Sequence, residues 1–449
     1  MSAESEQQAH HERVGRIVAQ IRKMAGTVSA PVKEREGVSH FVPLPGRASS
    51  NRPKLNLKEL NHILDINVGR MTCTAEPGVT FDELVRETLR FGLIPYTVPE
   101  LKTITIGGAV SGCSLESMSF QYGGFHDSCL EYEIITGRGE VVQCSPDNRN
   151  DSFQMIHGSY GTLGILSLIT FKLLPAHPCV QMRNVLFHDF DSFWNYMRER
   201  CEQKDVDFID GIIHAPDRLV VCEGRMVPAE DNLKLSKYDW LSVYYQSTLD
   251  KRVDNLALHD YFFRYDAECH WLSRTVPALE YWPVRMLLGN YLLGSTNLIE
   301  WSQKLSPLLK WKRRPDVVVD VFIPEHNFVR FFEWYQKDFD YYPLWIVPYR
   351  APRLYPWLSD EHAERMGTSF LIDCAVYGKP NDDPRIDYSE LLERKTYELN
   401  GIKTLISRNH YDETTFWSIY SRPRYESAKA GLDPDNLFGD LYQKFKPRN

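Results

Sequence analysis

Two short glycine strings in the stretch Thr97–Ala176 constrain this chain more than any other feature of its sequence. The first contains Gly107 and Gly108 behind a β-branched run, and the second, Gly158–Ile165, leads into a strand expected over Leu166–Leu174. Glycine lets a backbone approach a ligand closely or adopt positive φ. Each string alone is equally well explained by a tight turn or a bulge. Together, around one hairpin, they predict two turns that hold an extended cofactor along its length.

Several motifs in and beyond this stretch follow one another in a recognisable order. They are Val98–Leu101, Thr105–Gly108, Leu115–Ser117, Gln121–Gly123, Tyr160–Gly164, Pro343–Trp345, Pro348–Arg350 and the closing segment Asp433–Tyr442. This order resembles the FAD-binding domain of the vanillyl-alcohol oxidase and para-cresol methylhydroxylase (PCMH-type) flavoproteins. Within that group the chain is more similar to the Diminuto-like delta-24 sterol reductases. Bacterial relatives that reduce a methylene branch on fatty-acyl chains share the pattern, including His259–Tyr261 and Arg264–Asp266.

The resemblance implies FAD as the cofactor, with NADPH or another carrier as the electron donor. The residues that it places at FAD are Arg47, Ser49, Ser50, Thr105, Ile106, Gly107, Gly108, Ser111, Gly112, Ser117, Gly123, Tyr160, Gly161, Thr162, Gly164 and Ile165. In the wider family a histidine in the loop around Arg47 often anchors the flavin covalently. Because Arg47–Asn51 contains no histidine, we predict that FAD is held without a covalent bond, with Arg47 and the two serines donating hydrogen bonds to phosphate.

Short strands that alternate with helices predict an α+β fold rather than a doubly wound one. No Gly-x-Gly-x-x-Gly follows a strand within a βαβ unit, so a nicotinamide-binding Rossmann fingerprint is absent from the sequence. By resemblance, residues 1–178 form a PCMH-type FAD-binding domain of two α/β subdomains, with the boundary at the proline pair Pro175 and Pro178. Residues 179–449 form an α+β cap with a mixed or antiparallel sheet. An aromatic-rich insertion near 259–315 interrupts the cap, and its C-terminal segment returns to the flavin.

Local patterns predict individual elements of this fold. Apolar spacing predicts a helix over Glu12–Met24, and Thr80 with Glu83 predicts the start of a helix that ends at Phe91. Strands are expected on both sides of Gly137–Gly139, as a hairpin, and over Leu241–Tyr245. The pair His126 and Asp127 is expected in a turn or on the surface.

Composition excludes several classes of protein. The net charge of −8 argues against a nucleic-acid partner. Nine scattered cysteines without C-x-x-C predict neither a metal site nor a disulfide framework and favour a reducing compartment. Because Met1–His11 lacks a signal-peptide pattern and no apolar run is long enough to span a bilayer, we predict a cytoplasmic protein. The basic cluster Lys310–Arg314 with apolar Val284–Leu293 leaves open a peripheral membrane contact or a helix pair packed on the cap. The oligomeric state stays open.

The predicted activity is the FAD-dependent reduction of an isolated carbon–carbon double bond in an apolar lipid, either a sterol side chain or a methylene-branched fatty acyl chain. The enzyme would therefore act on a CH–CH group in steroid or fatty-acid metabolism. The open alternative is an FAD-linked oxidase or dehydrogenase that acts on an alcohol or a sugar. Reduction needs a proton from a general acid besides the hydride. The candidates for a catalytic role are Glu116, Tyr122, Tyr349, His410 and Tyr411, and for Glu116 a structural role is an equal alternative.

Overall fold

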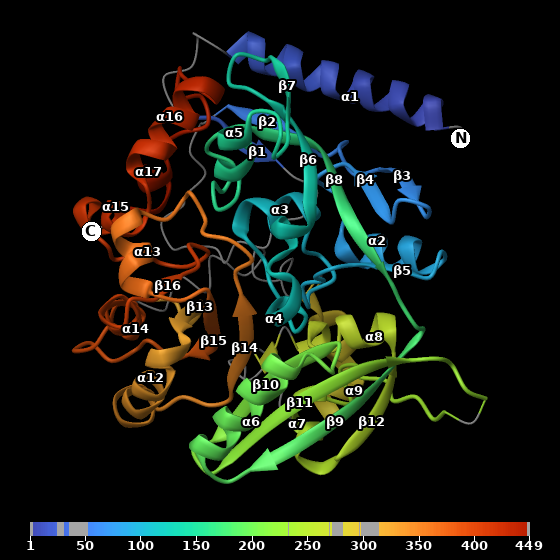
Figure 1. The fold of residues 1–449 in the computed structure, drawn as a ribbon, viewed down its shortest axis with the longest axis vertical. Coiled ribbons are helices and arrows are strands. Elements are labelled where there is room, and N and C mark those ends of the chain that lie inside the picture. The colour runs from blue at the N-terminus through green and yellow to red at the C-terminus, as the bar shows by residue number, and fades with distance from the viewer. Residues whose placement is uncertain are drawn as a thin grey trace.

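Two antiparallel sheets, one above the other in the view of Figure 1, organise the chain. The structure, a computed structural model, describes residues 3–24, 31–35, 53–231, 233–268, 270–271, 282–295, 297 and 314–446. The upper half is built from the N-terminal part of the chain and the lower half from the middle part. The last helices run back along the left side to the upper half (Figure 1).

The upper half is a six-stranded antiparallel sheet with helices on its faces. Its elements are α1 (Ala3–Met24), β1 (Lys33–Arg35), β2 (Lys54–Asn56), β3 (Ile63–Asn67), β4 (Thr72–Ala75), α2 (Phe81–Leu89), β5 (Leu93–Pro95), α3 (Ile106–Gly112), α4 (Ser119–Tyr122), β6 (Cys129–Ile135), β7 (Val141–Cys144), α5 (Asn150–Met155) and β8 (Ile165–Pro175). The strand order is β3-β4-β8-β6-β7, β5 pairs with β8, and β1 and β2 form a separate parallel pair. The long strand β8 therefore joins the two parts of this sheet.

Local sequence signals explain several of these elements. The Thr80 hydroxyl accepts a hydrogen bond from the amide of Glu83 at 3.3 Å, so α2 begins where the predicted N-cap stands. The predicted hairpin is confirmed, because β6 and β7 pair from Tyr132↔Cys144 to Ile135↔Val141 around the glycine turn. The predicted N-terminal helix is longer than expected and begins at Ala3.

The lower half is an eight-stranded antiparallel sheet of order β12-β9-β11-β10-β14-β15-β13-β16. Its strands are β9 (Cys179–Phe187), β10 (Phe208–Ala215), β11 (Arg218–Val227), β12 (Val253–Ala257), β13 (Val317–Pro324), β14 (Leu344–Arg350), β15 (Phe370–Lys379) and β16 (Ile402–Lys403). The helices of this part are α6 (Phe190–Gln203), α7 (Tyr244–Asp250), α8 (Leu258–Phe262), α9 (Trp282–Leu292), α12 (Phe328–Trp334), α13 (Asp360–Met366) and α14 (Tyr388–Glu398). Strands from before residue 259 and from after residue 315 belong to this one sheet and meet where β10 pairs with β14. The α+β prediction is confirmed.

The two faces of the eight-stranded sheet differ in character. Helices α6, α12 and α14 cover the outer face, where buried side chains such as Phe193, Phe331 and Leu392 pack on the strands. The inner face shares one hydrophobic core with the six-stranded sheet, and Trp345 and Val347 belong to that core. Because strand side chains alternate between faces, every second residue of β13, β14 and β15 points towards the upper half.

Two local predictions are wrong. Leu241–Tyr245 contains no strand, and its end begins the helix α7, because the aromatic pair Tyr244 and Tyr245 packs into the core from a helix. The first glycine string is not a turn after a strand. It is the start of α3, whose N-cap is Thr105, and the preceding residues contribute only an isolated bridge, Thr80↔Thr105.

Helix α1 is tied to the six-stranded sheet by a buried histidine. His10 Nδ1 lies 2.7 Å from Oε1 of Glu76, and its Nε2 lies 3.2 Å from Oε1 of Glu133. Arg13 Nε donates to the same Glu76 oxygen at 2.8 Å. Burial opposes the charged imidazole, but the hydrogen bonds to Glu133 and Glu76 outweigh burial and raise the pKa of His10 to about 9.

This raised pKa predicts a pH-dependent contribution to stability. The charged His10 stabilises the fold fully below pH 6.5, its ordinary pKa, and the stabilisation is lost as the pH rises through about 9. We expect His10→Gln to lower the free energy of unfolding by about 1.5–3 kcal/mol at low pH, as for hydrogen bonds to charged groups. Urea unfolding at pH 6 and pH 10 measures the difference, with His11→Gln, an exposed neighbour on the same helix, as the control. An equal loss at both pH values contradicts the charged state.

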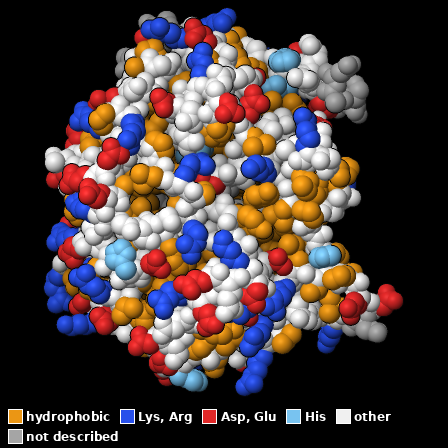
Figure 2. Space-filling model, viewed as in Figure 1, with side chains coloured by type: hydrophobic (Ala, Val, Ile, Leu, Met, Phe, Trp, Pro, Cys, Tyr) orange, Lys and Arg blue, Asp and Glu red, His pale blue; other side chains and the backbone are white. Residues whose placement is uncertain are grey.

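The surface carries no single dominant charge on the face drawn in Figure 2. Acidic and basic side chains are interspersed there, with hydrophobic side chains between them. Among the described helices, none combines the length and the apolar character that crossing a bilayer requires.

Candidate functional site

A cavity of ≈ 410 Å³ lies where the upper and lower halves meet the C-terminal segment. Gly112 at the end of α3, Tyr160 in the second glycine string and Tyr349 on β14 all line it. Most of the remaining wall is apolar: Leu115, Met155, Phe322, Leu354, Tyr355, Trp357, Leu358, Met366, Leu371, Ile402, Leu405 and Trp417. A cavity of this size and character is typical of a small-molecule or cofactor site.

The two glycine strings meet at this cavity through the backbone. The amide of Tyr160 donates to the carbonyl of Ser111 at 3.1 Å, which fixes the second string against α3. The hydroxyl of Tyr160 accepts a hydrogen bond from the amide of Leu405 at 3.0 Å. Residues that are far apart in the sequence are therefore held together at one wall of the cavity.

The helical start of the first string changes what its amides can do. The amide of Gly107 donates to the carbonyl of Pro77 at 2.9 Å, and the amide of Gly108 donates to the Thr105 hydroxyl at 3.2 Å. The amide of Ile106 donates to the carbonyl of Val79. Because these amides have protein partners, a ligand here would contact the bare backbone surface of Gly108, which is exposed.

The glycines of the predicted cofactor set fall into two groups. A Cβ at Gly112 would meet only a Tyr160 ring carbon at 3.8 Å, so the space beside it is open. A Cβ at Gly161 or Gly164 would lie 2.7 Å from Glu34 or Ile134, so these two glycines are needed for packing within the protein. Gly123 ends α4 at φ 77°, which explains the glycine without a ligand.

The C-terminal helices α15 (Glu413–Ile419), α16 (Arg422–Leu432) and α17 (Leu441–Phe445) lie beside the second glycine string. Lys429 Nζ donates to the carbonyl of Thr162 at 2.6 Å, and Tyr425 donates to its hydroxyl at 3.0 Å. Lys444 Nζ donates to the carbonyl of Tyr160 at 2.5 Å. The second glycine string leads into β8 at Ile165. Residues from the end of the chain therefore hold this string in position.

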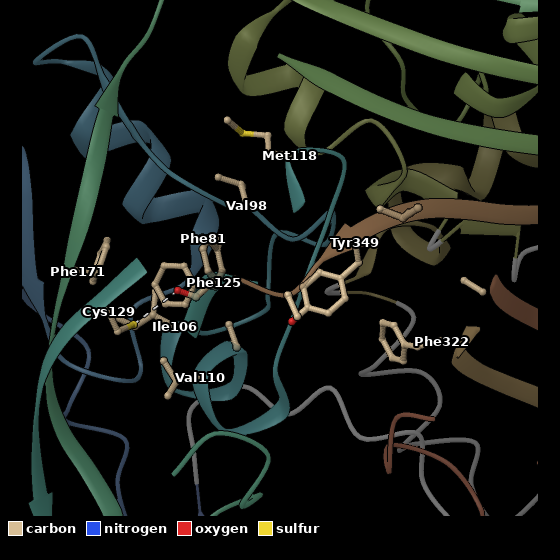
Figure 3. Close-up of a cluster of buried hydrophobic side chains, with 14 of the residues drawn as sticks. Phe81, Val98, Ile106, Val110, Met118, Phe125, Cys129, Phe171, Phe322 and Tyr349 are labelled. Atoms are coloured by element: carbon tan, nitrogen blue, oxygen red, sulfur yellow. Dashed lines mark hydrogen bonds between the residues drawn. The ribbon is translucent and has the colours of Figure 1, made fainter. Parts of the chain in front are cut away.

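A buried hydrogen-bond chain supports Tyr349. Its hydroxyl contacts that of Tyr355, which donates to Oδ2 of Asp127 at 2.6 Å. Arg353 lies 3.1 Å from the other oxygen of Asp127. Figure 3 shows Tyr349 extending from β14 towards Val110 of α3. Burial raises the pKa of Tyr349 well above its ordinary value, so its hydroxyl keeps its proton.

His126 and Asp127 lie in a 3-10 turn, as one of the two predictions had it, but the alternative that they lie on the surface is wrong. Both side chains are only 1% exposed. The 3-10 turn Phe125–Ser128 places them under the cavity wall, where the Asp127 carboxylate also accepts from the amide of Gly124. A short polar pair after a glycine pair is typical of an exposed turn. Only the contacts of Asp127 with Arg353 and Tyr355, which are distant in the sequence, show that this turn is buried.

Glu116 does not line the cavity. Its carboxylate accepts a hydrogen bond from Arg264 at 2.9 Å and bonds to Ser117, while Arg264 also lies 3.3 Å from Asp210 on β10. Ser117 Oγ is 2.9 Å from the hydroxyl of Tyr261. Burial raises the pKa of Glu116 to about 7, although Arg264 opposes the rise. The arrangement joins the two sheets, which favours the structural alternative for Glu116.

The other three candidates for catalysis lie away from the cavity wall. Tyr122 packs its ring 4.9 Å from that of Tyr96. The amide of His410 and the hydroxyl of Tyr411 both donate to Glu393, at 2.9 Å and 3.2 Å. Burial lowers the pKa of His410 to about 3, so its imidazole is neutral. Tyr349 is thus the one predicted catalytic residue that the described cavity brings together with the glycine strings.

Comparisons with known proteins find similarity along most of the chain. A family described as "FAD binding domain" matches residues 17–145, which include the first glycine string. A Delta(24)-sterol reductase of Homo sapiens is 24% identical over 455 residues, covering 97% of this chain and 86% of that protein. One of Arabidopsis thaliana is also 24% identical, covering 88% of this chain and 76% of that protein.

Residues 17–145 match an FAD-binding domain, and the chain is similar to Delta(24)-sterol reductases over nearly its full length at low identity. Cytokinin dehydrogenase 9 of Oryza sativa subsp. japonica is 31% identical, but over 140 residues, which are 31% of this chain. The likeness to sterol reductases therefore extends through the lower half, whereas the likeness to the dehydrogenase is partial.

The cavity fits one end of FAD by two observations. The wall at Gly112 leaves space for a ligand against the backbone of the FAD-binding domain. Ser159 Oγ, His157 Nδ1 and Trp357 Nε1 are buried polar atoms in the lining residues, and none has a hydrogen-bond partner within the described parts of the chain. Buried polar groups are normally satisfied, so these three can serve the polar edge of a flat heterocycle. Arg47, Ser49 and Ser50 lie outside the described residues.

Sequence reasoning missed several residues of this wall. Arg353, Tyr355 and Trp357 alternate directly after the Pro348–Arg350 motif, and that spacing was an available signal. Ser159 lies inside the second glycine string. His157 precedes it by two residues, and its Nε2 is 2.9 Å from the hydroxyl of Tyr132.

Proposed function

We propose that this protein is an FAD-dependent oxidoreductase that saturates an isolated carbon–carbon double bond in a lipid, a bond of the kind found in a sterol side chain. The observation that carries the proposal is the apolar cavity shared by the FAD-binding domain and the inner face of the eight-stranded sheet. The full-length similarity to proteins named Delta(24)-sterol reductase supports it. A methylene-branched fatty acyl chain is the alternative lipid.

Different residues of this chain would bind FAD, orient the lipid and exclude water. Gly108, Ser111, Gly112 and Tyr160 would hold FAD against α3 and the second string, and Arg47 with the two nearby serines would bind its phosphates. Reduced FAD supplies a hydride to the substrate when it is bound. Tyr349, fixed through Tyr355 and Asp127, would hydrogen-bond the ligand in the cavity. The apolar wall would exclude water and orient the lipid chain.

We place the boundary between the FAD-binding domain and the cap at residue 178. The six-stranded sheet ends with β8 at Pro175 and the eight-stranded sheet begins with β9 at Cys179. The C-terminal helices belong to the cap in sequence and support the glycine string of the first domain. We also propose NADPH as the electron donor and a non-covalent link to FAD.

An anaerobic experiment tests the activity. We expect NADPH to bleach the yellow protein, and a sterol with a side-chain double bond or a methylene-branched acyl lipid to restore the colour. The saturated form of each lipid is the control and should leave the protein bleached. Bleaching of the oxidised protein by an alcohol or a sugar, with no response to either lipid, would reverse the assignment in favour of an oxidase.

A separate experiment tests the non-covalent link to FAD. Acid precipitation that leaves FAD on the protein would contradict that link.

A further inference from the structure

The inner face of the eight-stranded sheet carries aspartates on strands that are mostly apolar. Asp373 in β15 is buried, and Asp320 in β13 is half-buried. In the ladder Asp373 stands opposite Phe322 of β13, and the next pair of β15 along the same face is Leu371 with Tyr349 of β14. This face therefore presents carboxyl groups towards the upper half of the molecule.

Asp373 lies beside the cavity. Its cross-strand neighbour Phe322 lines the cavity, and so do Leu371 and Tyr349 one step further along the face. Side chains on one face of neighbouring strands are close enough to contact the same ligand. Figure 3 shows Tyr349 and Phe322 together on the right of the hydrophobic cluster. Asp373 is thus the carboxyl whose strand neighbours form the cavity wall.

The surroundings of Asp373 disfavour a negative charge. Its side chain has no ion pair among the described residues, and its Oδ1 is buried without a hydrogen-bond partner among them. The acids that face it are Asp320, which accepts from the hydroxyl of Tyr377 at 2.6 Å, and Glu100, which is bound to His270. Burial raises the pKa of Asp373 well above its ordinary value, and repulsion from Asp320 and Glu100 adds to the rise. The surroundings of Asp373 therefore favour its protonated form.

The proposed reaction needs such an acid. An isolated double bond has no carbonyl to activate it, so its π electrons must take a proton directly from a group in the site. A phenol with an ordinary pKa near 10 is a far weaker acid than a carboxyl group with one near 4, and burial raises the pKa of Tyr349 further. Burial raises the pKa of Asp373 too, but a carboxyl group starts from the lower ordinary pKa, so Asp373 beside the apolar wall is the better proton donor of the two.

Building on the proposed function, we propose that Asp373, which lies one ladder position from the cavity wall, is the proton donor to the double bond of the lipid. The π pair of the double bond takes the proton of the Asp373 carboxyl group, whose O–H bond breaks and leaves its electrons on the carboxylate. Reduced FAD, when bound, would supply the hydride for the other carbon and would lose two electrons in doing so. A proton from solvent restores the acid. Asp320, with its hydroxyl partner Tyr377, keeps a second carboxyl close to Asp373 and so favours the protonated form.

Asp373→Asn tests this role, because asparagine keeps the shape and the neutral state but has no acidic proton. We expect the purified variant to retain FAD and to be reduced by dithionite like the wild type. Its anaerobic reoxidation by the unsaturated lipid should be roughly 10²–10⁴-fold slower, the usual effect of losing a general acid. Asp338→Asn, an exposed substitution on the far side of the outer helices, is the control and should react like the wild type.

A second readout does not depend on turnover. The infrared spectrum of the FAD-free wild type at pH 7 should contain a protonated-carboxyl carbonyl band that is missing in Asp373→Asn and shifts in heavy water. Absence of that band from the wild type overturns the inference, as does a variant reoxidised within threefold of the wild-type rate while the wild type reduces the lipid. In both cases the proposed function stands. If the wild type itself fails with every unsaturated lipid, the proposed function falls, and this inference falls with it.

Discussion

Gly112→Val is expected to yield a folded protein that has lost most of its affinity for FAD. The backbone at this position accepts a side chain, because a Cβ would meet only the Tyr160 ring at 3.8 Å and the residue lies in α3. The same position lines the cavity in which we propose that FAD binds. A branched side chain there would overpack the complex by about 1–3 kcal/mol, which is roughly a 5- to 150-fold weaker Kd.

The measurement separates binding from folding. FAD per protein chain follows from absorbance, the Kd from fluorescence titration of the FAD-free protein, and the stability of that form from its thermal midpoint. Gly15→Val is the matched control, since a Cβ at this exposed position of α1 meets nothing within 4 Å. Stoichiometric FAD in Gly112→Val would move the cofactor away from this wall. A loss of FAD together with a collapsed midpoint would point to misfolding instead.

Replacing Arg264 with methionine should lower the free energy of unfolding by about 3–5 kcal/mol, because it leaves the buried carboxyl groups that Arg264 pairs with unpaired. The guanidinium is fully buried between Glu116 of the FAD-binding domain and Asp210 of the eight-stranded sheet. It also stacks over the ring of Tyr261, with its central carbon 4.1 Å from the ring centroid. No other described ion pair joins these two carboxyls, so both halves of the molecule depend on Arg264.

The loss of stability in Arg264→Met should be larger at high pH than at low pH. With Arg264 present, burial already raises the pKa of Glu116 to about 7, and removal of the positive charge raises it further. A carboxyl whose folded pKa lies above its unfolded value destabilises the fold as the pH rises through that interval. The variant should therefore lose less stability at pH 5, where Glu116 is protonated, than at pH 8.

Urea unfolding of the FAD-free protein at both pH values checks this expectation. Arg16→Met is the control, because its pair with Glu59 is about half exposed on both sides, 55% and 56%. Such a surface pair contributes about 0–1 kcal/mol. A loss for Arg264→Met no larger than that of the control would show that the two carboxyls are stable together without their cation.

Local signals sufficed for elements whose causes are local. The N-cap at Thr80 and the hairpin around Gly137–Gly139 each depend on residues that are close together in the sequence. The same is true of the alternation of side chains that builds the strands. Local signals failed for Leu241–Tyr245, where burial of two tyrosines decided between strand and helix. They also failed at the first glycine string, because a glycine pair does not by itself distinguish a tight turn from a helix start.

By itself, the sequence determined the α+β class, the FAD-binding motif order and the presence of lone aspartates in the apolar strands β13 and β15, because these properties are visible along the chain. Only the tertiary structure decided which of these residues meet. Tyr355 reaches Asp127 across 228 positions of sequence, and Leu405 reaches Tyr160 across 245. Contacts at such separations arise from strand register and from the packing of one sheet on another. A register shift of one residue would turn Asp373 from the cavity side to the outer core.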